Sequence, residues 1–404
     1  MDSLRDIDGL IDVRKLIARH SVEQHQAQAD AYFAGYSEDS VLLRKPFQAV
    51  GEAAQITQGL SIMLRQLRLF HGARVMDFGA GTAWLSRILA YLHCEAIAVD
   101  LSKSALELGR RVIEKDHFAN QLKISYLPYD GVRIPLPDAH VERVCCFDAF
   151  HHVADQKATL REFFRVLKPG GIAGFHEPGP HHSRGADSQR EMAHFSVIEN
   201  DIVIEEIAAI ARDIGFGDVK VAWYMPGPIL MDVGRFNKLL GPDMSHADER
   251  AIVSRSRDDL QDVRIFFLYK PGEEVADSRS HSGLNARLAV NGLRRQGHDF
   301  VGSVVVENTG THVWLPSADG GVGAVRLGVQ VTDEAGRMIA LDYARFDVSD
   351  VCVRPGECTT VSFRIEAPAL AQYRLVFDLV SEFVAWFAQV GSQAVTISSR
   401  DLPK

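Results

Sequence analysis

The chain of 404 residues has few cysteines, no long apolar run and no excess of basic charge. Its five cysteines form neither a C-x-x-C pattern nor an even set, which argues against a disulfide framework and against a cysteine-bound zinc. No run approaches the roughly 20 apolar residues that a membrane-spanning helix requires, so we expect no membrane span. The formal net charge of -9 argues against a nucleic-acid partner, because phosphate binding requires a concentrated basic face.

The N-terminus, Met1-Asp2-Ser3-Leu4-Arg5-Asp6, lacks the basic and apolar regions of a signal peptide. Hydrophobic residues make up 46% of the chain and charged residues 24%, which is typical of a globular protein. We therefore expect a cytoplasmic protein. Its length allows two or three domains, each with its own core.

The stretch from Arg74 to Trp84 carries the strongest local signal. An apolar run ends in Asp77, Gly79 and Gly81 follow with one residue between them, and a helical pattern then begins. Glycines allow a sharp turn and the close approach of a ligand, and the amides at a helix start favour electron-rich groups. About 20 residues later a second apolar run ends in Asp100, whose carboxylate suits the two hydroxyls of a ribose. The pattern predicts a nucleoside pocket.

Two nucleoside ligands compete for this pattern. The dinucleotide fingerprint G-x-G-x-x-G requires a third glycine where this chain has Trp84, which disfavours NAD and leaves a dehydrogenase as a distant alternative. Asp77, two residues before the first glycine, is placed to accept from an ammonium group. The run Asp77-x-Gly79-x-Gly81-x-Ala83 resembles motif I of the class I S-adenosylmethionine-dependent methyltransferases, with alanine in place of the usual last glycine.

This resemblance implies S-adenosylmethionine as the cofactor, bound by acids that each follow a strand. Asp77 and the glycine turn would hold the methionine end, Asp100 the ribose and Asp130 the adenine amino group, while Asp148 would contact the methionine portion. The implied cofactor-binding residues are Asp77, Gly79, Ala80, Gly81, Asp100, Leu101, Asp130, Gly131 and Asp148.

Strand-like and helical runs alternate from Arg74 to about Tyr269, which predicts an α/β fold with parallel strands, helices on both faces and ligands at the carboxyl ends of the strands. With the resemblance, this becomes a seven-stranded Rossmann-like methyltransferase sheet. We expect an N-terminal helical extension or lid (1–70), a methyltransferase domain (71–272) with an acceptor-binding insertion (224–263), a linker (273–283) and an all-β sandwich (284–404).

The last 115 residues or so change to short strands separated by turns, which predicts an antiparallel sandwich. The runs Val306–Gly310 with Trp314, and Asp378–Phe387, resemble the immunoglobulin-like modules appended to polysaccharide-assembly enzymes and glycosyltransferases. That resemblance implies a sandwich that binds a glycan acceptor or polysaccharide-assembly proteins. The alternative is that Trp314, Trp386 and Phe387 are ordinary core residues.

Methyl transfer to an alcohol requires a general base with a pKa near neutrality, and histidine is the usual choice. Histidines follow the fourth predicted strand (151 and 152) and the fifth (176, 181 and 182). The fifth-strand run resembles an E-P-G-x-x-H-S stretch in a methyltransferase subgroup encoded with polysaccharide-assembly enzymes, which singles out Glu177 and His182. We expect His182 as the base, His152 as the next candidate, Glu177 as orienter or acceptor contact, and Glu199 as a weaker acceptor contact.

We expect no metal, because magnesium prefers carboxylates and water to imidazole and no pair of carboxylates stands out. The expected function is an S-adenosylmethionine-dependent O-methyltransferase acting on a sugar hydroxyl of a polysaccharide or other glycan. Two alternatives stay open: a methyltransferase for a small metabolite or natural product, and a non-catalytic glycan-binding scaffold.

Overall fold

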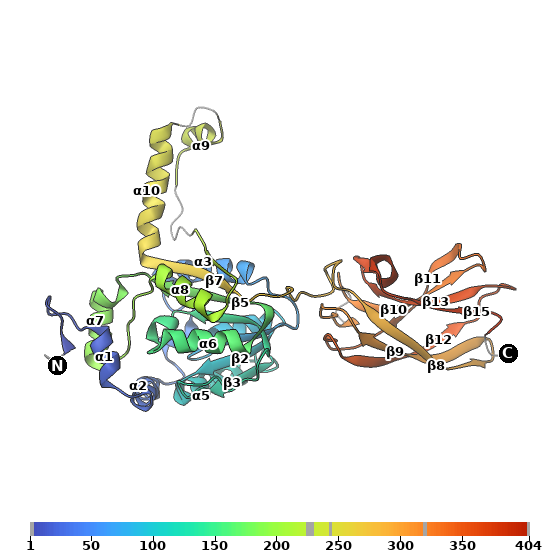
Figure 1. The fold of residues 1–404 in the computed structure, drawn as a ribbon, viewed down its shortest axis with the longest axis horizontal. Coiled ribbons are helices and arrows are strands. Elements are labelled where there is room, and N and C mark those ends of the chain that lie inside the picture. The colour runs from blue at the N-terminus through green and yellow to red at the C-terminus, as the bar shows by residue number, and fades with distance from the viewer. Residues whose placement is uncertain (1–3, 224–229, 242–244, 318–320, 402–404) are drawn as a thin grey trace. The chain divides into compact units, whose positions relative to one another are not determined.

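The computed structural model describes residues 4–223, 230–241, 245–317 and 321–401. The chain divides into two compact units, Met1–Leu69 with Ala73–Glu274, and Phe70–Gly72 with Val275–Lys404 (Figure 1). The division after Glu274 falls within the stretch 273–283 that the sequence analysis treats as a linker. The finer division into lid, insertion and linker stays a prediction.

Helices dominate the chain before the first strand of the sheet. Ser21 begins α2 with a capping box, in which its hydroxyl accepts from the Gln24 amide and the Gln24 side chain accepts from the Ser21 amide. The α-helices of this segment are α1 (Val13–Arg19), α2 (Val22–Ala34) and α3 (Val50–Gln66). Among the helices of the described ranges, none combines the length and the apolar character needed to cross a bilayer.

The first unit contains a seven-stranded sheet with the order β3-β2-β1-β4-β5-β7-β6. Its strands are β1 (Arg74–Phe78), β2 (Glu95–Asp100), β3 (Ile124–Pro128), β4 (Val141–Phe147), β5 (Leu167–Pro178), β6 (Asp218–Val221) and β7 (Val263–Tyr269). The helices between them are α4 (Trp84–Tyr91), α5 (Lys103–Lys115), α6 (Gln156–Val166), α7 (Ala186–Phe195), α8 (Ile204–Ile214), α9 (Val233–Leu240) and α10 (His246–Asp262). The Rossmann-like α/β sheet expected from the sequence is confirmed.

The expectation that every strand runs parallel is wrong for β7. This strand lies between β5 and β6 and pairs with both in the antiparallel direction. The crossover through α8 leaves a gap of one strand beside β5, and the chain returns through α9 and α10 to fill that gap from the opposite direction. Residues 224–229 and 242–244 of the expected acceptor insertion lie outside the described residues.

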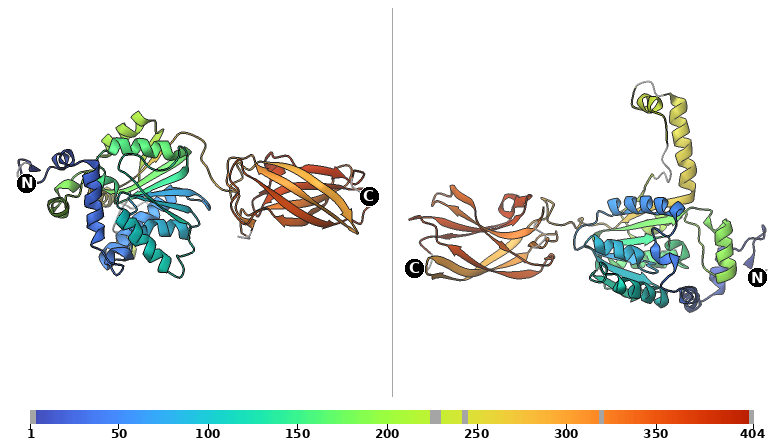
Figure 2. Two further views of the ribbon diagram at one scale, coloured as in Figure 1. Left: turned by 90° about the horizontal axis from the view of Figure 1, so that it is seen from below. Right: turned by 180° about the vertical axis from the view of Figure 1, so that it is seen from behind.

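Helices cover both faces of this sheet (Figure 2). Ile97 and Val99 of β2 belong to the same hydrophobic core as Phe163 of α6 and Ile207 of α8. Ala98, which points the other way because side chains alternate along a strand, packs in a separate core with α5. The sheet is thus buried on both sides, and its strand ends are where polar side chains become accessible.

The second unit consists of antiparallel strands in two sheets. One sheet has the order β11-β10-β13-β14 with β15 also paired to β13, and the other has the order β12-β9-β8. The strands are β8 (Ala286–Gln296), β9 (Asp299–Asn308), β10 (Val325–Thr332), β11 (Met338–Asp347), β12 (Cys358–Glu366), β13 (Arg374–Ser381), β14 (Ala385–Trp386) and β15 (Val395–Ser398). Side chains of both sheets form one core, and that core contains Trp314 and Phe387. The all-β character is confirmed.

Candidate active site

A cavity of about 520 Å³ opens at the carboxyl ends of β1, β2 and β4. The loops after these strands line one side of it, the helix α2 lines another, and the segment from Ser196 to Glu199 closes a third. The predicted site residues among its lining are Gly79, Gly81, Asp100, Leu101, Gly131, Asp148, His152, His182 and the weaker candidate Glu199. The cavity therefore brings together residues that the sequence analysis assigned to the cofactor and residues that it assigned to catalysis.

The turn after β1 depends on its glycines. Gly79 and Gly81 have φ angles of +69° and +53°, in the left-handed region that favours glycine. A Cβ atom on Gly79 would also lie 2.3 Å from the Cβ of Ala149, far inside van der Waals contact. The Gly79 and Ala80 amides donate to the Val99 carbonyl at 2.9 and 3.1 Å, which ties the turn to β2.

Asp100 lies at the end of β2 and connects two loops. Its carboxylate accepts from the Gly81 amide and from the Ser102 amide, both at 2.7 Å. Burial, opposed by these hydrogen bonds, raises the pKa of Asp100 to about 6. Leu101 follows in the cavity wall, and its carbonyl accepts from Gln26 of α2 at 3.4 Å.

Asp77, Ala80 and Asp130 do not line the cavity with the other cofactor candidates. The Asp77 side chain is 2% exposed and accepts from the Ser86 hydroxyl at 2.7 Å, and burial raises its pKa to about 7. Asp130 is exposed and caps its own loop, accepting from the amides of Val132 and Arg133 at 2.8 Å. These contacts give Asp77 and Asp130 structural partners, and their contacts with a cofactor stay predictions.

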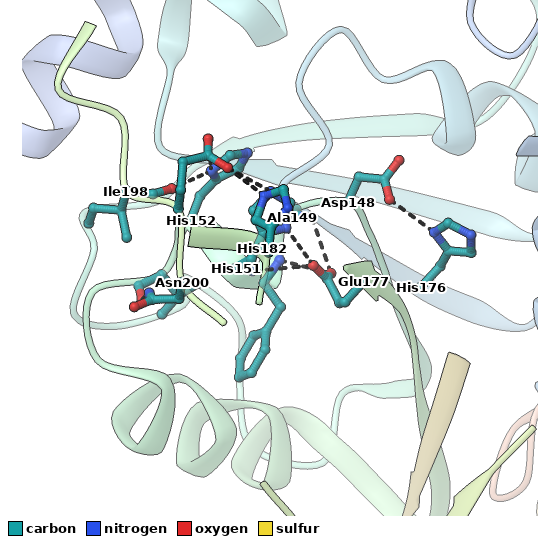
Figure 3. Close-up of polar contacts among 12 residues, drawn as sticks. Asp148, Ala149, His151, His152, His176, Glu177, His182, Ile198 and Asn200 are labelled. Atoms are coloured by element: carbon teal, nitrogen blue, oxygen red, sulfur yellow. Dashed lines mark hydrogen bonds and ion pairs between the residues drawn. The ribbon is translucent and has the colours of Figure 1, made fainter. Parts of the chain in front are cut away.

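Asp148 follows β4 with a left-handed φ of +50° and lines the cavity. It pairs with His176 Nδ1 at 2.9 Å (Figure 3). It also accepts from Lys45 at 3.1 Å. Burial disfavours the charged carboxylate, but Lys45 and His176 outweigh burial and hold the pKa of Asp148 below its usual range. Asp148 is therefore an anion at neutral pH, and it faces the same cavity as Asp100.

Glu177 lies at the end of β5 and is fully buried. Its carboxylate accepts from the amides of Ala149, Phe150 and His151 at 3.1, 2.9 and 3.2 Å, and from the His151 ring at 2.7 Å (Figure 3). The hydrogen bonds to Glu177 hold the short 3₁₀ helix Phe150–His152 at the cavity wall. Glu177 thus contacts the histidine loop and does not line the cavity.

His151, His152 and His182 gather around Glu199. Glu199 Oε2 lies 2.6 Å from His182 Nε2 and 3.9 Å from His151 Nε2, and Glu199 Oε1 lies 3.6 Å from His152 Nδ1. The closer partner of His152 Nδ1 is the Ile198 carbonyl, at 2.7 Å. Burial opposes ionisation of Glu199, but the His182 hydrogen bond and the neighbouring imidazoles keep its pKa below the usual value.

The two neighbouring histidines have pKa values that shift in opposite directions. Burial lowers the pKa of His151, but its hydrogen bond to Glu177 and the charges of Glu177 and Glu199 reverse the effect and raise it. The His152 side chain is exposed toward the cavity, but the protein atoms crowded around its ring displace water from it, and with the adjacent His151 they lower the pKa of His152 to about 4. His152 is therefore neutral at physiological pH.

Two partners of cavity residues, Lys45 and Glu199, have little or no signal in the sequence. Lys45 was part of a Lys-Pro-Phe run that signals only a helix break, and nothing in its local sequence indicates a partner 103 residues away. Glu199 lies in a loop with no regular period. The N-terminal segment was expected to form a lid, and two of its aromatic residues do line the cavity. They are Tyr32 and Phe33 of α2.

Comparison with known proteins gives a family match for part of the chain. Residues 76–175 match the family model described as "Methyltransferase domain". This range runs from β1 through β5 and contains the glycine turn, Asp100, Asp130 and Asp148. Within the first unit, the strands that carry the glycine turn and the candidate cofactor acids are thus similar to a methyltransferase domain.

Two curated relatives align with the same region. The ubiquinone/menaquinone biosynthesis C-methyltransferase UbiE of Ectopseudomonas mendocina is 32% identical over 115 residues, which cover 27% of this chain and 44% of that protein. The sterol 24-C-methyltransferase erg6 of Aspergillus fumigatus is 27% identical over 116 residues, which cover 28% of this chain and 30% of that protein. The chain thus spans less than half the length of each of these relatives.

Solved methyltransferase structures also align with the chain. Haemonchus contortus phosphoethanolamine N-methyltransferase 2 in complex with S-adenosyl-L-methionine aligns at 21% identity with a TM-score of 0.39, covering 65% of this chain and 61% of that one.

Proposed function

We propose that the protein is an S-adenosylmethionine-dependent O-methyltransferase whose acceptor is a sugar hydroxyl of a polysaccharide or other glycan. The observation that carries the proposal is a single cavity lined both by the glycine turn with Asp100 and by His152, His182 and Glu199. The methyl group of the donor must lie close to the acceptor hydroxyl and to the base that takes the hydroxyl proton. A single cavity lined by both sets of residues would meet this requirement.

On the donor side, Asp100 would accept from the ribose hydroxyls and Asp148 would attract the positively charged methionine portion. Gly79 and Gly81 leave space for the cofactor against the main chain, and Gly131 and Leu101 would flank its adenine. The aromatic side chains of α2, Tyr32 and Phe33, would cover the bound cofactor from the N-terminal side.

On the acceptor side, His182 would take the proton from the acceptor hydroxyl. Its Nε2 is engaged by Glu199, which leaves Nδ1 to receive the proton. The hydroxyl oxygen would then attack the methyl carbon, forming the C–O bond as the C–S bond breaks and leaving neutral S-adenosylhomocysteine. His152 is the second candidate base, and Glu177 would orient the histidine loop rather than touch the acceptor.

The sugar acceptor and the polysaccharide context rest on the E-P-G-x-x-H-S run and on the resemblance of the second unit to immunoglobulin-like modules. Under this proposal the second unit binds the glycan or a polysaccharide-assembly protein, and the protein works in the cytoplasm. The insertion 224–263 would also contact the acceptor, although none of its described residues lines the cavity.

A small apolar acceptor is the second candidate function. The acceptor end of the cavity is lined by Val153, Ala154, Val197 and Ile198, which would suit an apolar ring or chain. The two relatives named above are, by their names, enzymes of sterol and of ubiquinone or menaquinone biosynthesis, and their acceptors are therefore the natural apolar probes.

Product formation with two acceptor panels separates these candidates. Release of S-adenosylhomocysteine would be followed with glycans from the source cells and with sterol and quinone precursors. Dependence on glycan, with a mass increase of one methyl group on the sugar, supports the first proposal, and turnover only with apolar acceptors would replace it by the second. Absence of turnover and of cofactor binding would leave a non-catalytic scaffold.

The role of His182 is tested by His182→Ala with His181→Ala as a matched control, because His181 is its exposed neighbour in the same loop. We expect His182→Ala to reduce turnover by about a hundredfold, the usual contribution of a general base, while cofactor affinity stays within about twofold. Full activity in His182→Ala would transfer the role of base to another residue.

A further inference from the structure

Three side chains at the acceptor end of the cavity have the chemistry and spacing of a metal site. One ligand atom from each of His151, His152 and Glu199 lies within 4.8 Å of the other two. A cation at the centre of such a triangle lies at most about 2.8 Å (4.8 Å divided by √3) from each atom. Zinc bonds to nitrogen and oxygen measure about 2.0–2.2 Å, so a contraction of about 0.7 Å completes the coordination.

The hydrogen bonds of the two histidines fix which nitrogen is available. His151 donates its Nδ1 proton to the buried Glu177 carboxylate at 2.7 Å, and His152 donates its Nδ1 proton to the Ile198 carbonyl at 2.7 Å. Each ring then carries its lone pair on Nε2, and because it is Nδ1 of His152 that lies 3.6 Å from Glu199 Oε1, a cation beside Glu199 would require the His152 ring to turn. Metal-binding histidines characteristically donate their other ring proton to a carboxylate or to a backbone carbonyl, and here each of these two acceptors is present once.

The spacing between His151 and Glu199 fits a shared cation better than a shared proton. His151 Nε2 and Glu199 Oε2 lie 3.9 Å apart, which is too far for a hydrogen bond. A nitrogen and an oxygen bound to the same tetrahedral zinc lie about 3.4 Å apart, given bonds of about 2.1 Å. A lone pair and a carboxylate that face each other across this distance are stabilised by a positive charge between them.

We propose that His151, His152 and Glu199 bind a divalent transition metal of the zinc class, with Glu177 as the carboxylate that orients His151. Two imidazoles and one carboxylate are a ligand set of catalytic zinc sites, in which the fourth position is left for water or substrate. His151 and Glu199 are buried, whereas His152 is exposed toward the cavity, so the open position faces the acceptor.

Metal binding does not depend on the proposed function, but the role of the metal does. A metal that binds the acceptor hydroxyl lowers the pKa of that hydroxyl, and the proton then passes to His182, which Glu199 holds at 2.6 Å. The resulting oxygen anion attacks the methyl group as described above. From the sequence, a metal at the histidines with Glu177 was considered and not expected, because magnesium prefers carboxylates and water to imidazole; Glu199 approaches the histidines only in the folded chain.

The test uses the full chain, stripped with a chelator and titrated with zinc chloride by calorimetry, with the bound zinc counted by mass spectrometry. The exposed thiol Cys358 is replaced by serine in every sample, because a free thiol also binds zinc. We expect one zinc per chain, and a loss of affinity of tenfold or more in Glu199→Gln and in His152→Ala. The control is Glu191→Gln, which removes a carboxylate from the same cavity without touching the cluster.

Cobalt provides a second measurement that does not depend on activity. Cobalt bound by nitrogen and oxygen ligands gives visible absorption bands without the near-ultraviolet thiolate band, and Glu199→Gln should lose these bands while its circular dichroism stays unchanged. Absence of zinc binding, or equal zinc affinity in the Cys358→Ser parent and in its Glu199→Gln variant, would overturn the metal site. Zinc binding without any methyl transfer would keep the site and remove only its proposed role.

Discussion

Replacement of Glu177 tests whether one buried carboxylate organises the histidine loop. Four donors depend on it, the amides of residues 149, 150 and 151 and the His151 ring. A buried donor left without a partner costs about 1–3 kcal/mol, so loss of the partner of all four donors in Glu177→Ala should destabilise the first unit by about 4–12 kcal/mol. That is a large part of the 5–15 kcal/mol that a typical domain has. Glu177→Gln keeps one acceptor oxygen and should cost about half as much.

Because the chain has two units, one melting temperature does not describe its stability. Hydrogen exchange of the amides in β4 and β5 would measure the first unit, and the amides of β10 and β13 in the same sample would serve as an internal reference. Glu206→Ala, an exposed glutamate of α8, is the matched control and should change exchange by less than about 0.5 kcal/mol. If Glu177→Ala lowers the protection of β4 by less than about 1 kcal/mol, the assigned role is wrong.

Two further predictions concern the turn after β1 and the acid before it. Gly79→Ala should weaken cofactor binding more than tenfold, because of its φ of +69° and its contact with Ala149, and titration calorimetry giving an affinity within twofold of wild type would contradict this. Burial raises the pKa of Asp77 from 3.8 to about 7. Between about pH 4 and pH 7 the Asp77 carboxyl is therefore protonated in the folded chain and ionised in the unfolded chain. Stability should therefore fall as pH rises through this window, by at most about 4 kcal/mol for about three pKa units. Asp77→Asn should flatten the dependence of the first unit's melting temperature on pH from 5 to 8, and an unchanged slope would refute the assignment.

The strands of the first unit were predictable because their signals are local. Apolar runs that end in Asp77, Asp100 and Asp148 mark the carboxyl ends of β1, β2 and β4, and parallel pairing brings two of these acids to one cavity. The direction of β7 was not predictable in the same way. An antiparallel strand buried on both faces has the same apolar run as a parallel one, and only its pairing with β5 reveals the difference.

The start of β5 shows a second limit of local patterns. Lys168-Pro169-Gly170-Gly171 reads as a helix stop, and Gly170 does have a left-handed φ of +75°. Pairing with β4 nevertheless extends the strand back to Leu167 through a register shift. Partners such as Lys45 for Asp148 and Glu199 for the histidines arise from tertiary contacts between distant segments, for which a single sequence gives no signal.

The central claim, that the cavity beside the paired glycines binds S-adenosylmethionine, is tested most directly by titration calorimetry of the full chain with that cofactor. The wild type should bind one equivalent, and Asp100→Ala should lose about a hundredfold in affinity, since two hydrogen bonds from the ribose to a charged acceptor contribute about 3 kcal/mol. Asp187→Ala, an exposed aspartate of α7, should bind like the wild type. Equal affinity in the wild type and in Asp100→Ala, or no binding to the wild type, would contradict the account.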